Sequence, residues 1–134
     1  MADIITDRQE ELGQWMAERN AHRFIKGYGT YIGLESNGRI IACTGYDQYL
    51  VNSIQAHIAI DGRITKQWLW FIFYYPFAQA GVNKIIAPVL SDNIKSIRLC
   101  AKMGFILEAV INGAGPKGQD ILFMTLVKQQ CRFI

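Results

Sequence analysis

With 134 residues, the chain is long enough to enclose one hydrophobic core without disulfide bonds and too short for two ordinary domains. Hydrophobic residues make up 51% of it and charged residues 19%, which excludes a disordered composition. The formal net charge of +3 comes from scattered basic residues without a basic run. A nucleic-acid-binding arm is therefore not indicated, and an anionic small molecule fits the charge no less than a polymer.

Cysteines and apolar stretches indicate the compartment. Cys43, Cys100 and Cys131 lie far apart without a CxxC spacing, so we expect neither a disulfide framework nor a zinc site, and a reducing cytoplasm. The first residues are acidic and polar, so we expect no secretory leader. The most apolar run, residues 68–80, is shorter than the roughly 20 residues of a membrane span. We expect no membrane association.

The elements follow from hydrophobic spacing and turn residues. Thr6 and Gln9 have the spacing of a capping box, which predicts an amphipathic helix over residues 7–20. Asn37-Gly38 predicts the tight turn of a β-hairpin. The strands and helices after residue 20 are expected, in chain order, at 31–35, 39–46, 53–60, 68–80, 84–90, 94–103, 106–112 and 120–127. This order predicts an α/β fold with a mixed sheet.

A candidate anion site lies between residues 53 and 90, the one strand–helix–strand connection long enough for a parallel crossover. Ligands of such sheets gather at the carboxyl ends of the strands, here the loop 61–67. The first N–H groups of the next helix lack internal partners, and Arg63 and Lys66 add positive charge. The loop therefore suits a phosphate or pyrophosphate, although an ordinary solvated loop fits the same residues.

A motif covers residues 93–105, NIKSIRLCAKMGF, with Asn93, a small residue three places later, a helix and a closing Gly104-Phe105. In order and spacing it resembles a segment of the GNAT acyltransferases. The resemblance extends over nearly the whole chain, including His57, the run WLWFIFYYPFAQAGVNKI and the ending after Asp120, to small GNAT proteins of phages and prophages. Only the first two dozen residues do not contribute.

The resemblance implies one domain over residues 1–134 with the GNAT fold, a mixed sheet whose parallel strands 53–60 and 84–90 splay apart around acetyl-CoA, flanked by helices. It implies an N-acetyltransferase in which an amine attacks acetyl-CoA directly while backbone N–H groups of the central strand hold the thioester carbonyl. The contacts with the co-substrate CoA that it implies are Ile58, Ile60, Arg63, Ile64, Thr65, Lys66, Gln67, Trp68, Asn93, Ser96 and Arg98. It implies no metal.

The acceptor is an amine on a small molecule or a protein, which the sequence does not specify. The alternative function is a non-catalytic protein of the same fold that binds a partner protein, in a phage–host interaction or in a virion. A phage-encoded protein would work in the cytoplasm of the bacterial host. The aromatic helix 68–80 indicates core packing or a subunit contact, which leaves a homodimer open.

Two departures from the GNAT pattern favour the non-catalytic alternative, whereas Asn93 and Gly104-Phe105 favour an enzyme. Lys66 and Trp68 stand where the phosphate loop usually has small residues, and we expect Trp68 to narrow the loop. Cys100 stands where many GNAT enzymes carry the tyrosine that protonates the leaving thiolate. A core cysteine is our first interpretation of Cys100 and a covalent nucleophile the second.

His57 is the candidate general base, because an imidazole can accept a proton from an attacking amine near neutral pH. It shares a strand face with Gln55 and Ala59, opposite a packed face. A hydrogen-bonded structural histidine fits the same position. Asn93 likewise fits either a contact with the pantetheine arm or a helix cap.

Overall fold

The structure is a computed structural model that describes residues 2–20 and 24–134. In chain order its elements are β1 (Ala2–Ile5), α1 (Gln9–Arg19), β2 (Thr30–Ser36), β3 (Arg39–Asp47), β4 (Ser53–Ile60), α2 (Lys66–Tyr74), the π-helical segment η1 (Tyr75–Gln79), β5 (Lys84–Leu90), α3 (Ile94–Lys102), β6 (Ile106–Ile111), β7 (Ile121–Val127) and the 3-10 turn η2 (Lys128–Gln130).

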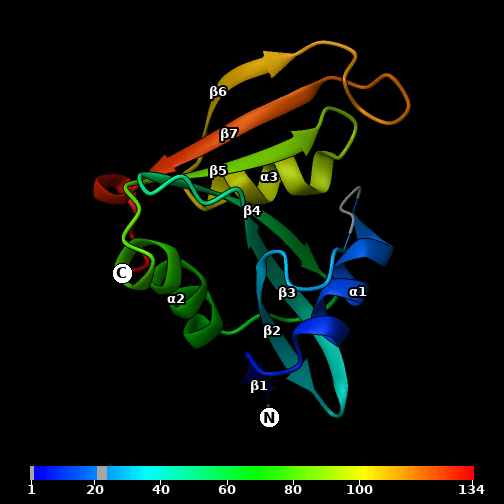
Figure 1. The fold of residues 1–134 in the computed structure, drawn as a ribbon, viewed down its shortest axis with the longest axis vertical. Helices are drawn as coiled ribbons and strands as arrows, with labels where there is room; N and C mark the ends of the chain where they lie inside the picture. The colour runs from blue at the N-terminus through cyan, green and yellow to red at the C-terminus, as the bar shows by residue number, and fades with distance from the viewer. Residues whose placement is uncertain (1, 21–23) are drawn as a thin grey trace.

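The strands form one seven-stranded sheet in the order β1-β2-β3-β4-β5-β7-β6. Every pairing between these strands is antiparallel except that of β4 with β5, which the α2 crossover connects. The predicted mixed sheet is confirmed. Figure 1 shows β1–β3 in one half of the molecule and β5, β7 and β6 in the other, with β4 between them.

The start of the chain differs from its prediction. Residues 2–5 form strand β1 against β2, which hydrophobic spacing did not reveal because the strand is only four residues long. The capping box is wrong, since the N-cap of α1 is Arg8 and makes no side-chain cap. Instead, the Gln9 side chain forms two 2.7 Å hydrogen bonds with the backbone N–H and C=O of Tyr31, which ties α1 to β2.

The hairpin follows the sequence closely. Asn37 and Gly38 adopt φ angles of 53° and 76° between β2 and β3, the left-handed conformations that an Asn-Gly turn requires. The helix expected at 68–80 begins two residues earlier, because the Thr65 side chain accepts a hydrogen bond from the N–H of Trp68 and caps it.

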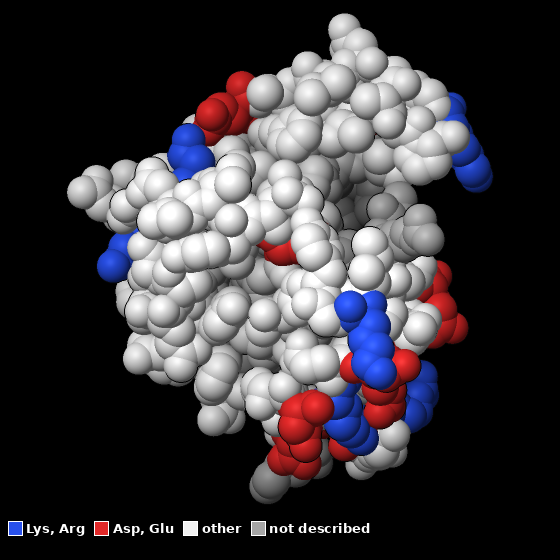
Figure 2. All heavy atoms as spheres, in the orientation of Figure 1, with Lys and Arg blue, Asp and Glu red and all other residues white. Residues whose placement is uncertain are grey.

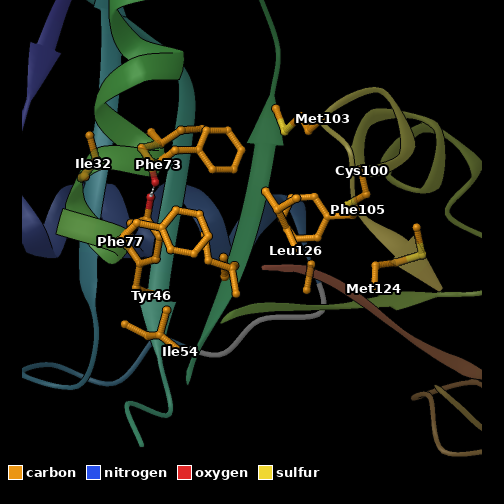
Figure 3. Packing of buried hydrophobic residues seen from close by; sticks show 14 of the residues in the cluster. Ile32, Tyr46, Ile54, Phe73, Phe77, Cys100, Met103, Phe105, Met124 and Leu126 are labelled. Atoms are coloured by element: carbon orange, nitrogen blue, oxygen red, sulfur yellow. Dashed lines mark hydrogen bonds between the residues drawn. The ribbon is translucent and has the colours of Figure 1, made fainter. Parts of the chain in front are cut away.

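Two hydrophobic clusters cover the two faces of the sheet. On one face α2, η1 and α3 contribute the buried residues Trp68, Ile72, Phe73, Phe77, Cys100 and Met103 (Figure 3). On the other face α1 packs Leu12, Trp15 and Met16 onto the strands. Here Gly33 is required, because a Cβ atom would lie 2.3 Å from the Leu12 side chain. The helices therefore cover β2–β4 on both faces.

Pro76 explains the turn from α2 into η1. Proline has no N–H to donate to the carbonyl of Ile72 four residues earlier. The buried Tyr46 hydroxyl donates to this Ile72 carbonyl instead (Figure 3), so the freed acceptor is satisfied across the core. Burial raises the pKa of Tyr46 well above its usual value, which keeps the hydroxyl protonated as a donor.

Replacing Tyr46 by phenylalanine is expected to lower the free energy of unfolding by about 1–3 kcal/mol, because the Ile72 carbonyl would be buried without a donor. Urea unfolding of both proteins measures the difference. The matched control is Tyr74→Phe, which alters a half-buried tyrosine on α2, the helix of Ile72. It should change the free energy of unfolding by less than about 0.5 kcal/mol. Equal stabilities of the Tyr46 and Tyr74 variants would contradict this explanation of η1.

Charged side chains are unevenly distributed over the surface. On the face shown in Figure 2 they gather in the region of α1 and β1–β3, while the surface over β5 and β7 shows few. Within the described ranges, no helix has the length and apolar character needed to cross a bilayer.

Candidate active site

The parallel strands β4 and β5 separate after a short pairing. Only three residue pairs join them, the last being Gln55 with Ile86. The N–H of Lys84 donates to Asn52 at 3.2 Å, so every second residue of β5 directs its backbone toward β4. Pro88 is one of these residues and has no N–H to offer. Pro88 thus lies beyond the last hydrogen-bonded pair of β4 and β5. Proline is expected at such an unpaired edge because it cannot donate a hydrogen bond to a neighbouring strand.

A cavity of about 400 Å³ occupies this gap. Its walls come from β4, β5, α3, the end of α1 and the β6–β7 loop: Asn20, Ala56, His57, Ile58, Ala87, Pro88, Val89, Leu90, Asn93, Ser96, Leu99, Cys100, Ala114, Pro116 and Ile121. Of the residues that the sequence nominated, four lie together here, namely His57, Ile58, Asn93 and Ser96.

The helices α2 and α3 begin at the carboxyl edge of the sheet, directly after β4 and β5. Thr65 caps α2, and Asn93 caps α3 by accepting from the N–H of Ser96 at 3.2 Å. Asn93 is therefore a helix cap and also lines the cavity. Two helix N-termini with their partial positive charges stand at the edge where the strands diverge, an arrangement that favours anionic groups.

The remaining nominated residues lie outside the cavity. Arg63, Lys66 and Gln67 are exposed on and after the β4–α2 loop, Ile60, Ile64 and Thr65 are half-buried there, and Arg98 is exposed on α3. They do not line the 400 Å³ space, and their contact with a phosphate group stays a prediction.

The expectation for Trp68 is wrong. Its side chain is fully buried in the core, and its indole N–H donates to the carbonyl of Ile32 at 3.4 Å. The ring therefore neither narrows the phosphate loop nor presents a side-chain contact to a ligand. The aromatic residues on every side of α2 correctly indicated that Trp68 packs in the core. The comparison with the GNAT phosphate-loop pattern did not.

Two residues that the sequence analysis missed donate hydrogen bonds to backbone carbonyls of β4. These carbonyls face the gap, where β5 no longer pairs with β4. The Asn20 amide donates to the carbonyl of Ile58 at 3.1 Å, and the Lys95 ammonium donates to that of Ile60 at 2.9 Å. Lys95 thus brings a further positive charge to the carboxyl end of β4. No sequence signal marks either role, because each depends on where the strands separate.

A third missed residue, Asp47, accompanies His57. The His57 Nε2 and Asp47 Oδ1 atoms lie 3.1 Å apart, and the two side chains are only 16% and 12% exposed. Since Asp47 pairs with Gln55 in the β3–β4 ladder, it lies on the same sheet face as His57. A carboxylate beside an imidazole fixes the orientation of the ring, the relation on which histidine bases depend.

Tyr31 completes this corner of the site. A Cβ atom on Gly45 would lie 2.6 Å from the Tyr31 ring, so the glycine allows the ring to rest on β3 opposite His57. Burial, and secondarily the negative charge of Asp47, raise the pKa of Tyr31 to about 12. The hydroxyl is therefore protonated at neutral pH.

Cys100 lines the cavity but has the properties of a core residue. Its side chain is 4% exposed, and burial raises the pKa of the thiol to about 11, so the nucleophilic thiolate is scarce at neutral pH. In the parts of the chain that the structure describes, no three histidine, cysteine, aspartate or glutamate side chains are grouped to hold a metal ion.

In the direct transfer that the resemblance implies, no covalent bond to Cys100 is needed, so Cys100→Ala is expected to retain activity. Intact-protein mass spectrometry during turnover should show no acetyl group on Cys100. Alkylation of Cys100 should be slow at pH 8 and accelerate as the pH approaches 11, since the thiolate fraction then rises. An acetylated Cys100 peptide that forms and decays with turnover would contradict direct transfer.

The comparisons with known proteins establish the fold. No protein-family model matches the sequence, and no curated protein does. Spermidine N-acetyltransferase from Vibrio cholerae in complex with CoA and spermine superposes with a TM-score of 0.72, at 13% identity, over 96% of this chain and 96% of that chain. The chain has the GNAT fold. The dodecameric structure of the Vibrio cholerae enzyme in an intermediate state gives a TM-score of 0.73, at 14% identity, over 96% of this chain and 94% of that chain.

The GNAT fold confirms the predicted fold class, with β4 and β5 as the splayed strands and the cavity between them. The order of elements from β2 to β7 follows the prediction, and β7 lies between β5 and β6. Because the identities are low, the likeness concerns the arrangement of the chain. The reaction has to be argued from this chain's own residues.

Proposed function

We propose that the protein is an acetyl-CoA-dependent N-acetyltransferase that transfers the acetyl group directly to an amine. The observation that supports this most is the cavity between β4 and β5, which has His57 in its wall, paired with Asp47 behind it, and the N-terminal cap of α3 at its edge. The residues fit the co-substrate: an apolar slot suits the pantetheine arm, and the helix N-termini with Arg63, Lys66 and Lys95 suit the phosphates.

The backbone of β4 supplies the electrophilic part of the site. The carbonyl of Ile58 points into the gap, where Asn20 donates to it. Within a strand the N–H of a residue points to the same side as its carbonyl, so the Ile58 N–H also faces the gap. It is placed to donate to the thioester oxygen as negative charge develops there, the contribution of an oxyanion hole.

The proton is handled by His57. As the amine nitrogen bonds to the acetyl carbon, it loses a proton to the imidazole, which Asp47 orients. The carbon–sulfur bond then breaks and CoA departs as the thiolate, which takes up a proton from water, while the imidazolium returns its proton to water. Acetyl-CoA supplies the acetyl group, and the protein supplies position, a hydrogen-bond donor and a base.

The acceptor is an amine, and its identity belongs to this proposal. Polyamines are worth testing first, because the enzymes that share the fold are named spermidine N-acetyltransferases and one of them is in complex with CoA and spermine. Peptide N-termini and lysine side chains are the protein alternatives. An origin in a phage, a cytoplasmic location, a homodimer and one domain over residues 1–134 stay predictions.

A turnover experiment tests the proposal. The protein is incubated with acetyl-CoA and, in turn, spermidine, a simple alkylamine and a lysine peptide, and release of CoA thiol and acetylated product are both measured. We expect equal amounts of thiol and acetylamine with at least one acceptor, lost in His57→Gln. Tight acetyl-CoA binding without acetylation of any amine class would favour the non-catalytic alternative of the same fold.

A further inference from the structure

A second cavity, of about 440 Å³, lies at the amino-terminal end of β4, which is the end opposite the mouth of the splay. The tyrosines of its wall are Tyr28, Tyr46, Tyr49 and Tyr75. Its volume is within the range of small-molecule sites in proteins, roughly 300–1,000 Å³. The reaction described above does not use this cavity.

Aromatic side chains form the cavity from several elements. The rings of Tyr46 and Tyr75 lie 5.1 Å apart at an angle of 52°, and Tyr46 is fixed by its hydrogen bond to Ile72. Tyr28 and Tyr49 are 43% and 54% exposed, so their rings border the opening. Ring faces carry partial negative charge and attract organic cations.

The charge of the wall points the same way. Among the described residues that line the cavity, Asp47 alone carries a formal charge, and none is basic. The Asp47 side chain is 12% exposed, so bulk water screens it little. A cavity that has tyrosines, one aspartate and the polar residues Gln48 and Gln79 in its wall is suited to an ammonium group.

Asp47 also joins the two cavities. Asp47 is a lining residue of the second cavity, and its carboxylate lies 3.1 Å from His57 Nε2, while His57 lines the first. A cation held at Asp47 is thus one hydrogen-bonded pair away from the proposed base.

The backbone beside the cavity is strained. Gln48 and Val51 adopt positive φ angles of 51° and 65°, which are uncommon for residues other than glycine and especially for a β-branched valine. The hydrogen bonds from Leu50 to Ser53 at 2.9 Å and from Asn52 to Leu50 at 2.6 Å hold this loop. Strained backbone of this kind concentrates at functional sites, and here it positions Gln48 and Tyr49 on the cavity wall.

We infer that the tyrosine cavity binds an aliphatic ammonium group, with Asp47 as its counter-ion and the rings of Tyr28, Tyr46, Tyr49 and Tyr75 as its walls. This site selects acceptors that carry a positively charged amine. The binding itself depends only on the cavity, whereas its role in choosing the acceptor rests on the proposed function.

The experiment compares n-butylamine, which is an ammonium ion at pH 7, with n-butanol, its neutral counterpart of the same shape. Each is titrated into the protein without acetyl-CoA, and NMR chemical shifts are followed. We expect saturable binding of n-butylamine with shifts at Gln48, Tyr49 and Gln79, and at least tenfold weaker binding of n-butanol. Equal affinities for the two compounds, or no saturable binding of n-butylamine, would overturn the inference.

Variants separate charge from shape. Asp47→Asn should weaken the binding of n-butylamine at least tenfold. Glu18→Gln removes the same charge from an exposed position on α1 and should leave this binding unchanged. Tyr49→Leu should weaken the binding of n-butylamine severalfold. Tyr49→Phe should not, because phenylalanine keeps the aromatic ring. Tyr49 is exposed, so this pair tests the site even if Asp47→Asn fails to fold. Unchanged affinity in Tyr49→Leu and in a folded Asp47→Asn would refute the site.

Acetyl-CoA affinity, measured on the same samples, distinguishes the two proposals. If acetyl-CoA binds and n-butylamine does not, the tyrosine cavity is not a cation site and the proposed reaction is unaffected. If n-butylamine binds and acetyl-CoA does not, the cation site holds and the proposed reaction falls.

Discussion

His57→Gln is expected to lower kcat by about 10²–10⁴-fold, the contribution usual for a general base. The structure places His57 in the cavity wall between β4 and β5 with Asp47 3.1 Å away. Glutamine keeps a polar side chain of similar length but cannot accept a full proton. Acetyl-CoA affinity should change little, because the phosphates and the pantetheine arm are expected to contact other residues.

The pH profile separates catalysis from structural damage. With His57 as the base, the pH dependence of the activity should differ between the unaltered protein and His57→Gln. Thermal unfolding of both proteins is the control for folding. Full activity with the same pH profile in His57→Gln would show that the histidine is structural and that solvent takes the proton.

Arg63→Ala and Lys66→Ala are each expected to weaken acetyl-CoA binding by about 1–3 kcal/mol, because each removes a charge-assisted contact with a phosphate. Both side chains are exposed beside the N-terminus of α2, so their loss should leave the fold intact. Isothermal titration calorimetry measures the affinities.

Lys128→Ala removes one positive charge from an exposed position at the end of β7, next to the amino-terminal end of β5, and serves as the matched control. It should bind acetyl-CoA as the unaltered protein does. If Lys128→Ala weakens binding as much as Arg63→Ala, the cations act only through the overall charge. If none of the three variants changes the affinity, the phosphates lie elsewhere.

Much of the fold could be predicted, because its signals are local. Three such signals are the Asn37-Gly38 turn, the alternation of residues 53–60 and Gly104, which ends helix α3. Each specifies a conformation within a few residues. The crossover between β4 and β5 follows from its length alone. Strand β1 and the placement of β7 between β5 and β6 depend on pairings across the chain, for which a single sequence has no local signal.

The site was predictable only in part, for a related reason. His57 and Asn93 were nominated because a strand face and a helix cap can be read locally, and the cavity brings them together. Asp47 was missed because its contact with His57 depends on the register of β3 against β4. Lys95 was missed because its carbonyl partner at Ile60 is free only where the strands have separated.

The most direct test of the account is calorimetric titration of the intact protein with acetyl-CoA, together with its melting temperature at saturation. The account predicts one saturable site per chain and a higher melting temperature, because a ligand that binds only the folded state stabilises it. The absence of heat and of any thermal shift at millimolar acetyl-CoA would contradict it, since the cavity between β4 and β5 would then not hold this co-substrate.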